Sequence, residues 1–254
     1  MQSLELKNLS KHFGGLKAVD KVSFLIEPGE FVGLIGPNGS GKSTLFNVVA
    51  GSLAPTAGQV LLDGREISGT SPAGTFERGL VRSFQIPRLF FGMSVLENVL
   101  VAARQQQGEN LSSVLGSGWR RQERELTERA LDTLEFLNLA HVARNRASDL
   151  SGGQMKLLEL ARSLMADPKV LLLDEPAAGV VPALAHEIFE RLVEYQQQTG
   201  LTLLVIEHRL EVLFGAVDRV LVMNQGQLIA SGSPDSVAED PAVVEAYFGT
   251  GEPA

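Results

Sequence analysis

The sequence predicts an α/β fold with a mostly parallel central sheet. Three apolar runs, at 31–35, 170–173 and 201–206, have the length of strands that are buried on both faces. Helical patterns of apolar residues alternate with these runs along the chain. Buried strands that alternate with helices are typical of a parallel sheet with helices packed on its faces.

Shorter alternating segments predict antiparallel strands beside this core. Apolar and polar residues alternate at 4–6 and 22–26, and Val60 and Leu62 lead into a hairpin turn at Asp63-Gly64. A loop is expected over 68–74 and a last short helix over 241–248.

The character of the chain changes between about residues 87 and 150, where strand signals are few. Ser94 and Glu97 form a capping-box pattern, and apolar residues then recur at helical spacing. We therefore expect one domain over residues 1–254, with a helical insert at about 87–150 and a C-terminal tail at 249–254.

Composition narrows the function classes. The net charge of −8 over 254 residues argues against a nucleic-acid partner, and the absence of cysteine excludes disulfides and thiolate metal sites. The N-terminus lacks the apolar core of a signal peptide, and no apolar run approaches the roughly 18 residues of a membrane span. We expect a cytoplasmic protein whose contact with a membrane runs through a partner.

The stretch at 36–44 is the most specific chemical signal. It fits the pattern G-x-x-x-x-G-K-[ST], and a buried strand enters it while a helical pattern leaves it. Glycines let backbone N–H groups turn toward a polyphosphate, and the start of the following helix attracts the same anion. Lys42 is expected to reach the β and γ phosphates and Ser43 to ligate Mg²⁺. The predicted binding residues are Asn38, Gly39, Ser40, Gly41, Lys42, Ser43 and Thr44.

Two carboxylates end the apolar run at 170–173. In a parallel sheet, ligands bind at the carboxyl ends of the strands, so Asp174 and Glu175 are expected near the loop at 36–44 if the strands are close. Asp174 is suited to hold Mg²⁺, and Glu175 is suited to polarise an attacking water. Alone, the pair is equally typical of surface acids at a strand end, but the complete loop favours the site.

Two further polar residues are candidates for the same site. His208 follows the run at 201–206 and can donate to a γ-phosphate, although a single histidine is more often structural. Gln85 lies near the start of the helical insert, where it could also be an ordinary loop amide.

A second Gly-rich helix start lies at Ser151, Gly152, Gly153 and Gln154. Ser151 can cap this helix, and the segment can bind an anion. A plain N-cap is the simplest alternative. Because the chain already has one complete phosphate site, we expect this segment to complete the site of another chain.

The motifs at 36–44, 150–154 and 170–175, together with His208, resemble the nucleotide-binding subunit of an ATP-binding cassette (ABC) transporter. The resemblance covers about Leu4 to Gly249. It implies the ABC ATPase fold of the P-loop NTPases, with a RecA-like mostly parallel core, an antiparallel β subdomain and a helical subdomain. It also implies two subunits head to tail, with two ATP molecules between them.

The resemblance implies roles for the metal and catalytic residues. Glu175 would be the catalytic base and His208 the γ-phosphate switch. Gln85 would contact Mg²⁺ and sense a transmembrane partner, while Ser43 and Asp174 would be the other metal ligands.

It also implies nucleotide contacts outside the loop. Phe13 would stack on the adenine of ATP with Val19 nearby, although a core position for Phe13 is the alternative. Ser151 and Gly153 would contact the γ-phosphate bound to the opposite subunit.

Within this family, the sequence is similar to the branched-chain amino acid uptake group, in segments that include 13–19, 33–39, 95–99, 174–179 and 244–249. That similarity implies import of branched-chain or neutral hydrophobic amino acids, with urea or short amides as the runner-up. The implied partners are a second ATPase subunit, identical or different, transmembrane permease subunits and, indirectly, a periplasmic or extracellular binding protein. The permeases would hold the chain at the inner face of the cell membrane.

Two positions depart from the family pattern. Val181 stands where an Asn or Asp usually bridges the subunits, so cross-talk between the ATP sites is in question, and Arg209 replaces a usual acidic or polar residue.

Two other function classes fit less well. A soluble ABC ATPase acting on ribosomes or DNA would usually carry two cassettes or a long coiled coil, and a non-hydrolysing subunit would need a damaged site.

Overall fold

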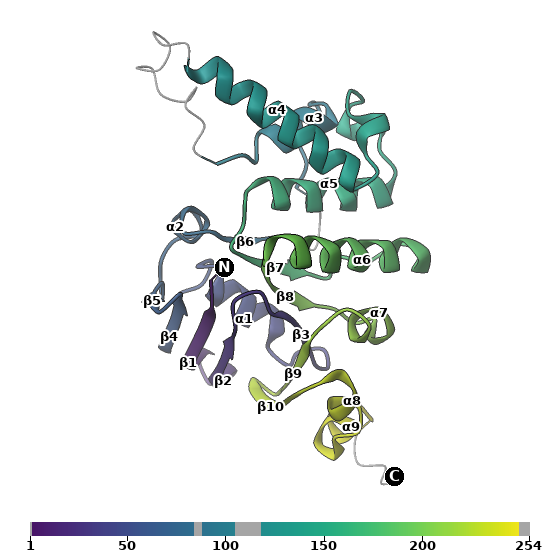
Figure 1. The fold of residues 1–254 in the computed structure, drawn as a ribbon. Helices are drawn as coiled ribbons and strands as arrows, with labels where there is room; N and C mark the ends of the chain where they lie inside the picture. Colours follow the sequence, from purple (N-terminus) through teal and green to yellow (C-terminus); the bar gives the residue numbers. More distant parts are fainter. Residues whose placement is uncertain (1, 84–87, 105–117, 249–254) are drawn as a thin grey trace. The chain divides into compact units, whose positions relative to one another are not determined.

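The computed structural model describes residues 2–83, 88–104 and 118–248. It divides the chain into two compact units, whose elements are labelled in Figure 1. The first unit comprises Met1–Arg82, Lys169–Glu175 and Leu192–Ala254. The second unit comprises Ser83–Pro168 and Pro176–Arg191.

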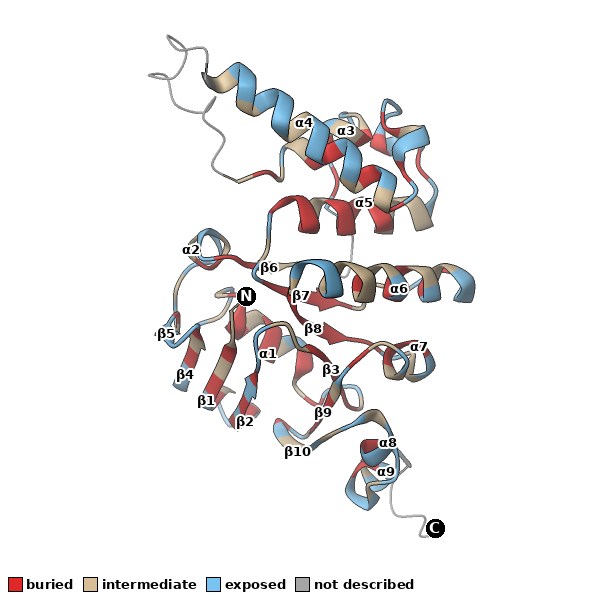
Figure 2. Ribbon diagram, viewed as in Figure 1, coloured by how far each residue is buried: buried red, intermediate tan, exposed pale blue. Residues whose placement is uncertain are grey.

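The larger sheet of the first unit contains the predicted buried strands. Its strands are β3 Phe31–Ile35, β6 Leu80–Arg82, β7 Val170–Asp174, β8 Thr202–Ile206, β9 Arg219–Asn224 and β10 Gln227–Gly232. Among the described residues their order is β10-β9-β3-β8-β7-β6, and every neighbouring pair is parallel except β10 with β9. Strands β3, β7 and β8 are buried along their length, as Figure 2 shows in red. The predicted mostly parallel sheet is confirmed.

The smaller sheet of the first unit is antiparallel. Its strands are β1 Leu4–Phe13, β2 Leu16–Ile26, β4 Ala57–Leu62 and β5 Arg65–Glu66, in the order β2-β1-β4-β5 among the described residues. The predicted hairpin turn is confirmed, with φ of +52 at Asp63 and +72 at Gly64. Positive φ at both central residues suits the twist of a tight hairpin.

Helices complete the first unit: α1 Lys42–Val49, α2 Pro72–Glu77, α7 Leu210–Phe214, α8 Pro234–Ala238 and α9 Pro241–Phe248. The predicted last helix is confirmed. The loop predicted over 68–74 is partly wrong, because α2 already begins at Pro72. Ser71 caps that helix, and its Oγ accepts a hydrogen bond from the Gly74 N–H at 3.3 Å.

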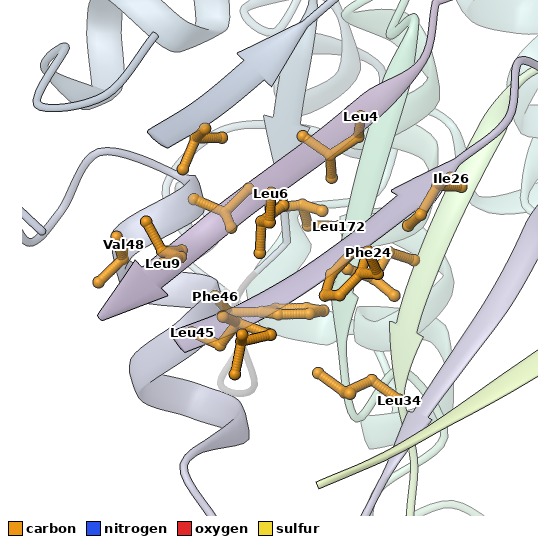
Figure 3. Close-up of a cluster of buried hydrophobic side chains, with 14 of the residues drawn as sticks. Leu4, Leu6, Leu9, Phe24, Ile26, Leu34, Leu45, Phe46, Val48 and Leu172 are labelled. Atoms are coloured by element: carbon orange, nitrogen blue, oxygen red, sulfur yellow. The ribbon is translucent and has the colours of Figure 1, made fainter. Parts of the chain in front are cut away.

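The core of the first unit holds α1 in place. Leu45 and Phe46 of α1 are fully buried in one cluster with Leu4 of β1 and Leu34 of β3 (Figure 3). Burial of each large apolar side chain contributes roughly 1.5–3 kcal/mol. The start of α1, and with it the loop at 36–41, is therefore anchored by the packing of Leu45 and Phe46.

The second unit is built from helices: α3 Val95–Leu100, α4 Gly118–Phe136, α5 Gly152–Met165 and the part of α6 Pro182–Thr199 up to Arg191, with short 3-10 helices at Ala140–Val142 and Ala147–Asp149. The predicted capping box at α3 is confirmed. The Ser94 Oγ accepts from the Glu97 N–H at 3.2 Å, and the Glu97 carboxylate accepts from the Ser94 N–H at 2.7 Å.

Candidate functional site

The loop between β3 and α1 is closely approached by backbone from two other strands. Gly36 has φ +149, and a Cβ there would lie 2.1 Å from the carbonyl oxygen of Met223 in β9. Gly41 has φ +104, and a Cβ there would lie 2.2 Å from the carbonyl oxygen of Ala18 in β2. Glycine fits these positions because it has no Cβ and tolerates positive φ. The glycines of the motif therefore serve packing as well as access to a ligand.

Lys42 is buried at the start of α1, with 6% of its surface exposed. Its Nζ donates hydrogen bonds to the carbonyl oxygens of Gly36 at 2.7 Å and Pro37 at 3.1 Å. Burial lowers the pKa of Lys42, and the charges of Glu175 and Asp174 oppose that shift. The lysine of the loop thus interacts electrostatically with both carboxylates at the end of β7.

The ends of three neighbouring strands bring these groups together. Strand β8 lies between β3 and β7 in the sheet, so the loop after β3 and the carboxylates after β7 occupy the same edge. Asp174 is buried, with 8% of its surface exposed.

Glu175 has φ +51, a left-handed conformation that is uncommon for residues other than glycine. Backbone strain of this kind concentrates at functional sites.

Glu175 is in direct contact with His208, the residue two positions after β8. The His208 Nε2 lies 3.1 Å from the Glu175 Oε1, and the histidine side chain is 46% exposed. The sequence predicted a separate role for each residue but not this contact. An exposed imidazole beside a carboxylate can orient or exchange a proton at this edge of the sheet.

Arg82, the last residue of β6, was missed by the sequence analysis. Its guanidinium Nη2 donates to the Asp174 Oδ2 at 2.9 Å, and its Nη1 donates to the Asn47 Oδ1 at 2.6 Å. The side chains of Arg82 and Asp174 are 12% and 10% exposed. The available signal was a single arginine that ends a three-residue strand shortly before Gln85, and periodicity does not detect so short a strand.

A cavity of about 480 Å³ lies at this edge of the first unit. Gly41 caps α1 without a side-chain hydrogen bond, so no side chain competes with a ligand for the first N–H groups of that helix. The volume and the mixed polar and apolar lining suit a nucleotide. The lining residues are Leu16, Lys17, Ala18, Asn38, Gly39, Ser40, Gly41, Lys42, Ser43, Thr44, Glu175, His208, Gln225 and Gly226.

The two residues expected near adenine lie in different environments. Phe13 ends β1 with 47% of its surface exposed, and the Lys11 Nζ lies 5.1 Å from its ring centre. Phe13 is therefore not a core residue. Val19 is fully buried in the hydrophobic core, and neither residue lines the cavity.

The second Gly-rich segment starts α5 in the second unit. Ser151 caps the helix, and its Oγ accepts from the Gln154 N–H at 3.3 Å while the Gln154 Oε1 accepts from the Ser151 N–H at 2.9 Å. Ser151 and Gly152 are exposed, and a Cβ on Gly152 would meet nothing within 4 Å. Gln85, another predicted site residue, lies outside the described residues.

The donor set fits Mg²⁺ bound together with phosphate. Within 2–83, 88–104 and 118–248, the structure contains no group of three or more His, Cys, Asp or Glu side chains able to hold a metal alone. The exposed Ser43 lines the cavity. Asp174 is not among the lining residues, but it ends β7 directly before Glu175, which does line the cavity, so its carboxylate is the adjacent oxygen ligand. Mg²⁺ is commonly held by one or two protein oxygens plus substrate phosphates, so a sparse set of oxygen ligands is what it requires.

Among the helices that the structure describes, none is both long enough and apolar enough to cross a membrane.

Family comparisons match both the core and the C-terminal end of the chain. The pattern of the family described as "ABC transporter" matches residues 19–178. A second pattern, described as "Branched-chain amino acid ATP-binding cassette transporter", matches residues 227–253.

Curated relatives are similar over nearly the whole chain. A "probable branched-chain amino acid transport ATP-binding protein" from Methanocaldococcus jannaschii is 43% identical over 253 residues, which is 98% of each chain. A "high-affinity branched-chain amino acid transport ATP-binding protein" from Escherichia coli K12 is 40% identical over 248 residues, which is 97% of each chain.

Solved structures share the fold. The ADP conformation of an ATP-binding cassette of an ABC transporter has a TM-score of 0.84 at 43% identity, covering 98% of this chain and 100% of that one. A dimeric cassette in a post-hydrolysis state with ADP and Pi has a TM-score of 0.74 at 27% identity, covering 91% of this chain and 98% of that one. The expected ABC ATPase fold is thereby confirmed.

Proposed function

The chain belongs to the ABC transporter family, whose ATP-binding subunits hydrolyse ATP, and we propose that it powers the uptake of branched-chain or neutral hydrophobic amino acids. The observation that carries the solute class is similarity to relatives named for branched-chain amino acid transport over nearly the full length. The pattern that matches residues 227–253 bears the same description. These names favour amino acids over urea or short amides.

The residues at the cavity support distinct roles in ATP hydrolysis. The N–H groups of 38–44 and the Lys42 ammonium bind the β and γ phosphates. Glu175 polarises the attacking water, and His208, in contact with it, interacts with the γ-phosphate. Phe13, exposed at the end of β1, stacks on the adenine, whereas the buried Val19 fixes the adjoining strand from the core side.

Ser43, Asp174 and Gln85 are the proposed Mg²⁺ ligands. The metal would neutralise charge on the phosphate oxygens when bound. Asp174 ends β7 at the edge of the sheet where α1 begins with Lys42 and Ser43, and this shared edge supports the assignment.

A second ATPase subunit, identical or different, is the proposed partner of the segment Ser151–Gln154. This segment contacts the γ-phosphate held by the other subunit, so that ATP binds the closed pair better than the open one. Such differential binding is the condition for driving a conformational change. The dimeric cassette with ADP and Pi supports pairing of this kind.

The remaining partners follow from the family. Transmembrane permease subunits hold the chain at the cytoplasmic face of the membrane, and a periplasmic or extracellular binding protein delivers the amino acid to them. We assign residues 1–254 to one nucleotide-binding domain, with a helical subdomain at about 87–150 and a tail at 249–254.

The substitution Glu175→Gln tests the hydrolytic assignment. A missing general base lowers turnover by roughly 100-fold or more, whereas the amide leaves the phosphate contacts in place. We expect unchanged ATP binding by calorimetry and a large loss in phosphate release. Glu123→Gln, at an exposed position in α4, is the control and should behave like the parent. Near-parental turnover of Glu175→Gln would remove Glu175 as the base.

The solute class requires a separate test. Cells that carry Glu175→Gln in place of the parent should lose uptake of labelled leucine and isoleucine while urea uptake stays unchanged. The reverse result would reassign the solute.

In a parallel experiment on the partners, Glu175→Gln with ATP and Mg²⁺ should retain multi-span permeases and the second ATPase during purification from detergent-solubilised membranes.

A further inference from the structure

Arg82 joins three elements of the first unit through one guanidinium group. It ends β6, it donates to Asp174 at the end of β7, and it donates to Asn47 in α1. Its Cζ also lies 5.9 Å from the centre of the Phe46 ring, whose side chain is fully buried in the core. A planar guanidinium with two separate acceptors and an aromatic neighbour has little rotational freedom.

These contacts determine how Asp174 is presented. A carboxylate on a strand end can rotate about its side-chain bonds, but the Oδ2 of Asp174 is fixed by a charged hydrogen bond of 2.9 Å. The second hydrogen bond of Arg82, to Asn47, connects that carboxylate to α1, which begins with Lys42 and Ser43. The two proposed Mg²⁺ ligands of the described structure are thus coupled through Arg82 and one helix.

A purely structural role explains the buried pair of Arg82 and Asp174 less well than a positioning role does. Burying a charged pair is costly, and an apolar pair of similar volume would often hold β6 against β7 equally well. The Arg82 guanidinium instead donates a hydrogen bond to Asp174, a proposed metal ligand. Residues that hydrogen-bond to metal ligands commonly orient those ligands.

We propose that Arg82 is a positioning residue that presents the Asp174 carboxylate to the Mg²⁺ of the bound nucleotide. The inference rests on the proposed function, because it requires a nucleotide and a metal in the cavity of the first unit. It assigns Arg82 no contact with the nucleotide itself.

The test separates nucleotide affinity with Mg²⁺ from affinity without it. Binding of a non-hydrolysable ATP analogue is measured by calorimetry, in Mg²⁺ and in EDTA, for the parent, Arg82→Met and Arg82→Lys. We expect affinity in EDTA to be unchanged, and the gain from Mg²⁺ to fall about tenfold in Arg82→Met, the lower end of what outer partners of metal ligands contribute. Arg82→Lys keeps the charge but not the fork, so its loss should be intermediate.

Arg78→Met is the matched control. Arg78 lies in the same unit, is exposed, and donates to the Gly74 carbonyl at 2.9 Å rather than to a carboxylate. It should leave the Mg²⁺ gain at the parental value. The double variant Arg82→Met/Asp174→Asn should lose no more of that gain than Asp174→Asn alone, because Arg82 acts through Asp174.

The outcomes are distinct. A parental Mg²⁺ gain in folded Arg82→Met or Arg82→Lys overturns the positioning role, even if the unfolding temperature falls. If Arg82→Met does not fold, Arg82→Lys decides. A parent that binds no nucleotide overturns the proposed function and this inference with it, whereas Mg²⁺-dependent binding by the parent with unaffected Arg82 variants overturns this inference alone.

Discussion

Two Gly-rich helix starts in this chain look alike in sequence and differ in structure. At α1, Gly41 has φ +104, its missing Cβ makes room for the Ala18 carbonyl, and Lys42 is buried. At α5, Ser151 caps the helix with its own side chain, and Gly152 faces open space. At α1 a backbone carbonyl crowds the capping glycine. At α5 Gly152 is free of neighbours, and the next residue, Gly153, faces the flexible side chain of Leu184.

The difference agrees with the role proposed for the backbone N–H groups of each start. The start of α1 has no side-chain cap, so its N–H groups suit a ligand that this chain binds by itself. The start of α5 already satisfies one N–H through Ser151, and it is exposed. This arrangement suits contact with a ligand that another subunit holds, and it makes the two starts separable by mutation.

Alanine substitutions at Gly41 and Gly152 should give the largest difference between the two helix starts. Gly41→Ala forces an alanine into φ +104 against a carbonyl 2.2 Å away, so we expect a loss of at least about 2 kcal/mol in unfolding free energy and loss of nucleotide binding. Gly152→Ala, the control, should leave stability unchanged or raise it by up to about 1 kcal/mol. Denaturant unfolding and calorimetry measure both. Equal losses in the two variants would contradict the distinction.

Lys42→Met should weaken nucleotide binding by roughly 10- to 100-fold, the contribution of a charged hydrogen-bonding partner. The substitution should also remove a pH dependence of the unfolding free energy. Burial lowers the pKa of Lys42 in the folded state, so between that value and the unfolded value near 10.4 the unfolded chain binds more protons. The unfolding free energy of the parent should therefore rise relative to the variant as pH increases through this window. A difference that is flat up to pH 10 would rule out the shift.

Ser151→Ala should have a small effect on the isolated chain. Loss of an N-cap costs about 1 kcal/mol, and nucleotide affinity of the single subunit should not change because Ser151 does not line the cavity. In the assembled transporter, ATP turnover should nevertheless fall. Ser151→Thr, which keeps a hydroxyl cap, should restore stability. A fall in affinity of the isolated Ser151→Ala chain would place the segment in this chain's own site.

The sequence was most informative where the chemistry is local. The loop at 36–44, the buried strands and the capping box at Ser94 depend on neighbouring residues, and periodicity or a short motif specifies them. The resemblance, not a local pattern, suggested Val19 for the neighbourhood of the adenine, and the structure buries its side chain in the core.

The rest of the site depends on contacts between distant residues. Arg82 and Asp174 are 92 positions apart, and β6 is a strand of three residues that exists through its pairing with β7. The left-handed backbone of Glu175 also has no signal in residue type, since glutamate is not a residue that favours positive φ. Tertiary structure decides these features, so local patterns do not predict them.

That left-handed backbone has an evolutionary consequence. At φ +51, glycine or asparagine would relax the backbone, whereas glutamate adopts this conformation at a cost in strain. With the proposed role of Glu175 as the catalytic base, selection for stability and selection for catalysis would act in opposite directions at position 175. In a lineage released from the need for hydrolysis, drift should replace this glutamate early, and its loss would mark the end of catalysis before any other part of the fold decayed.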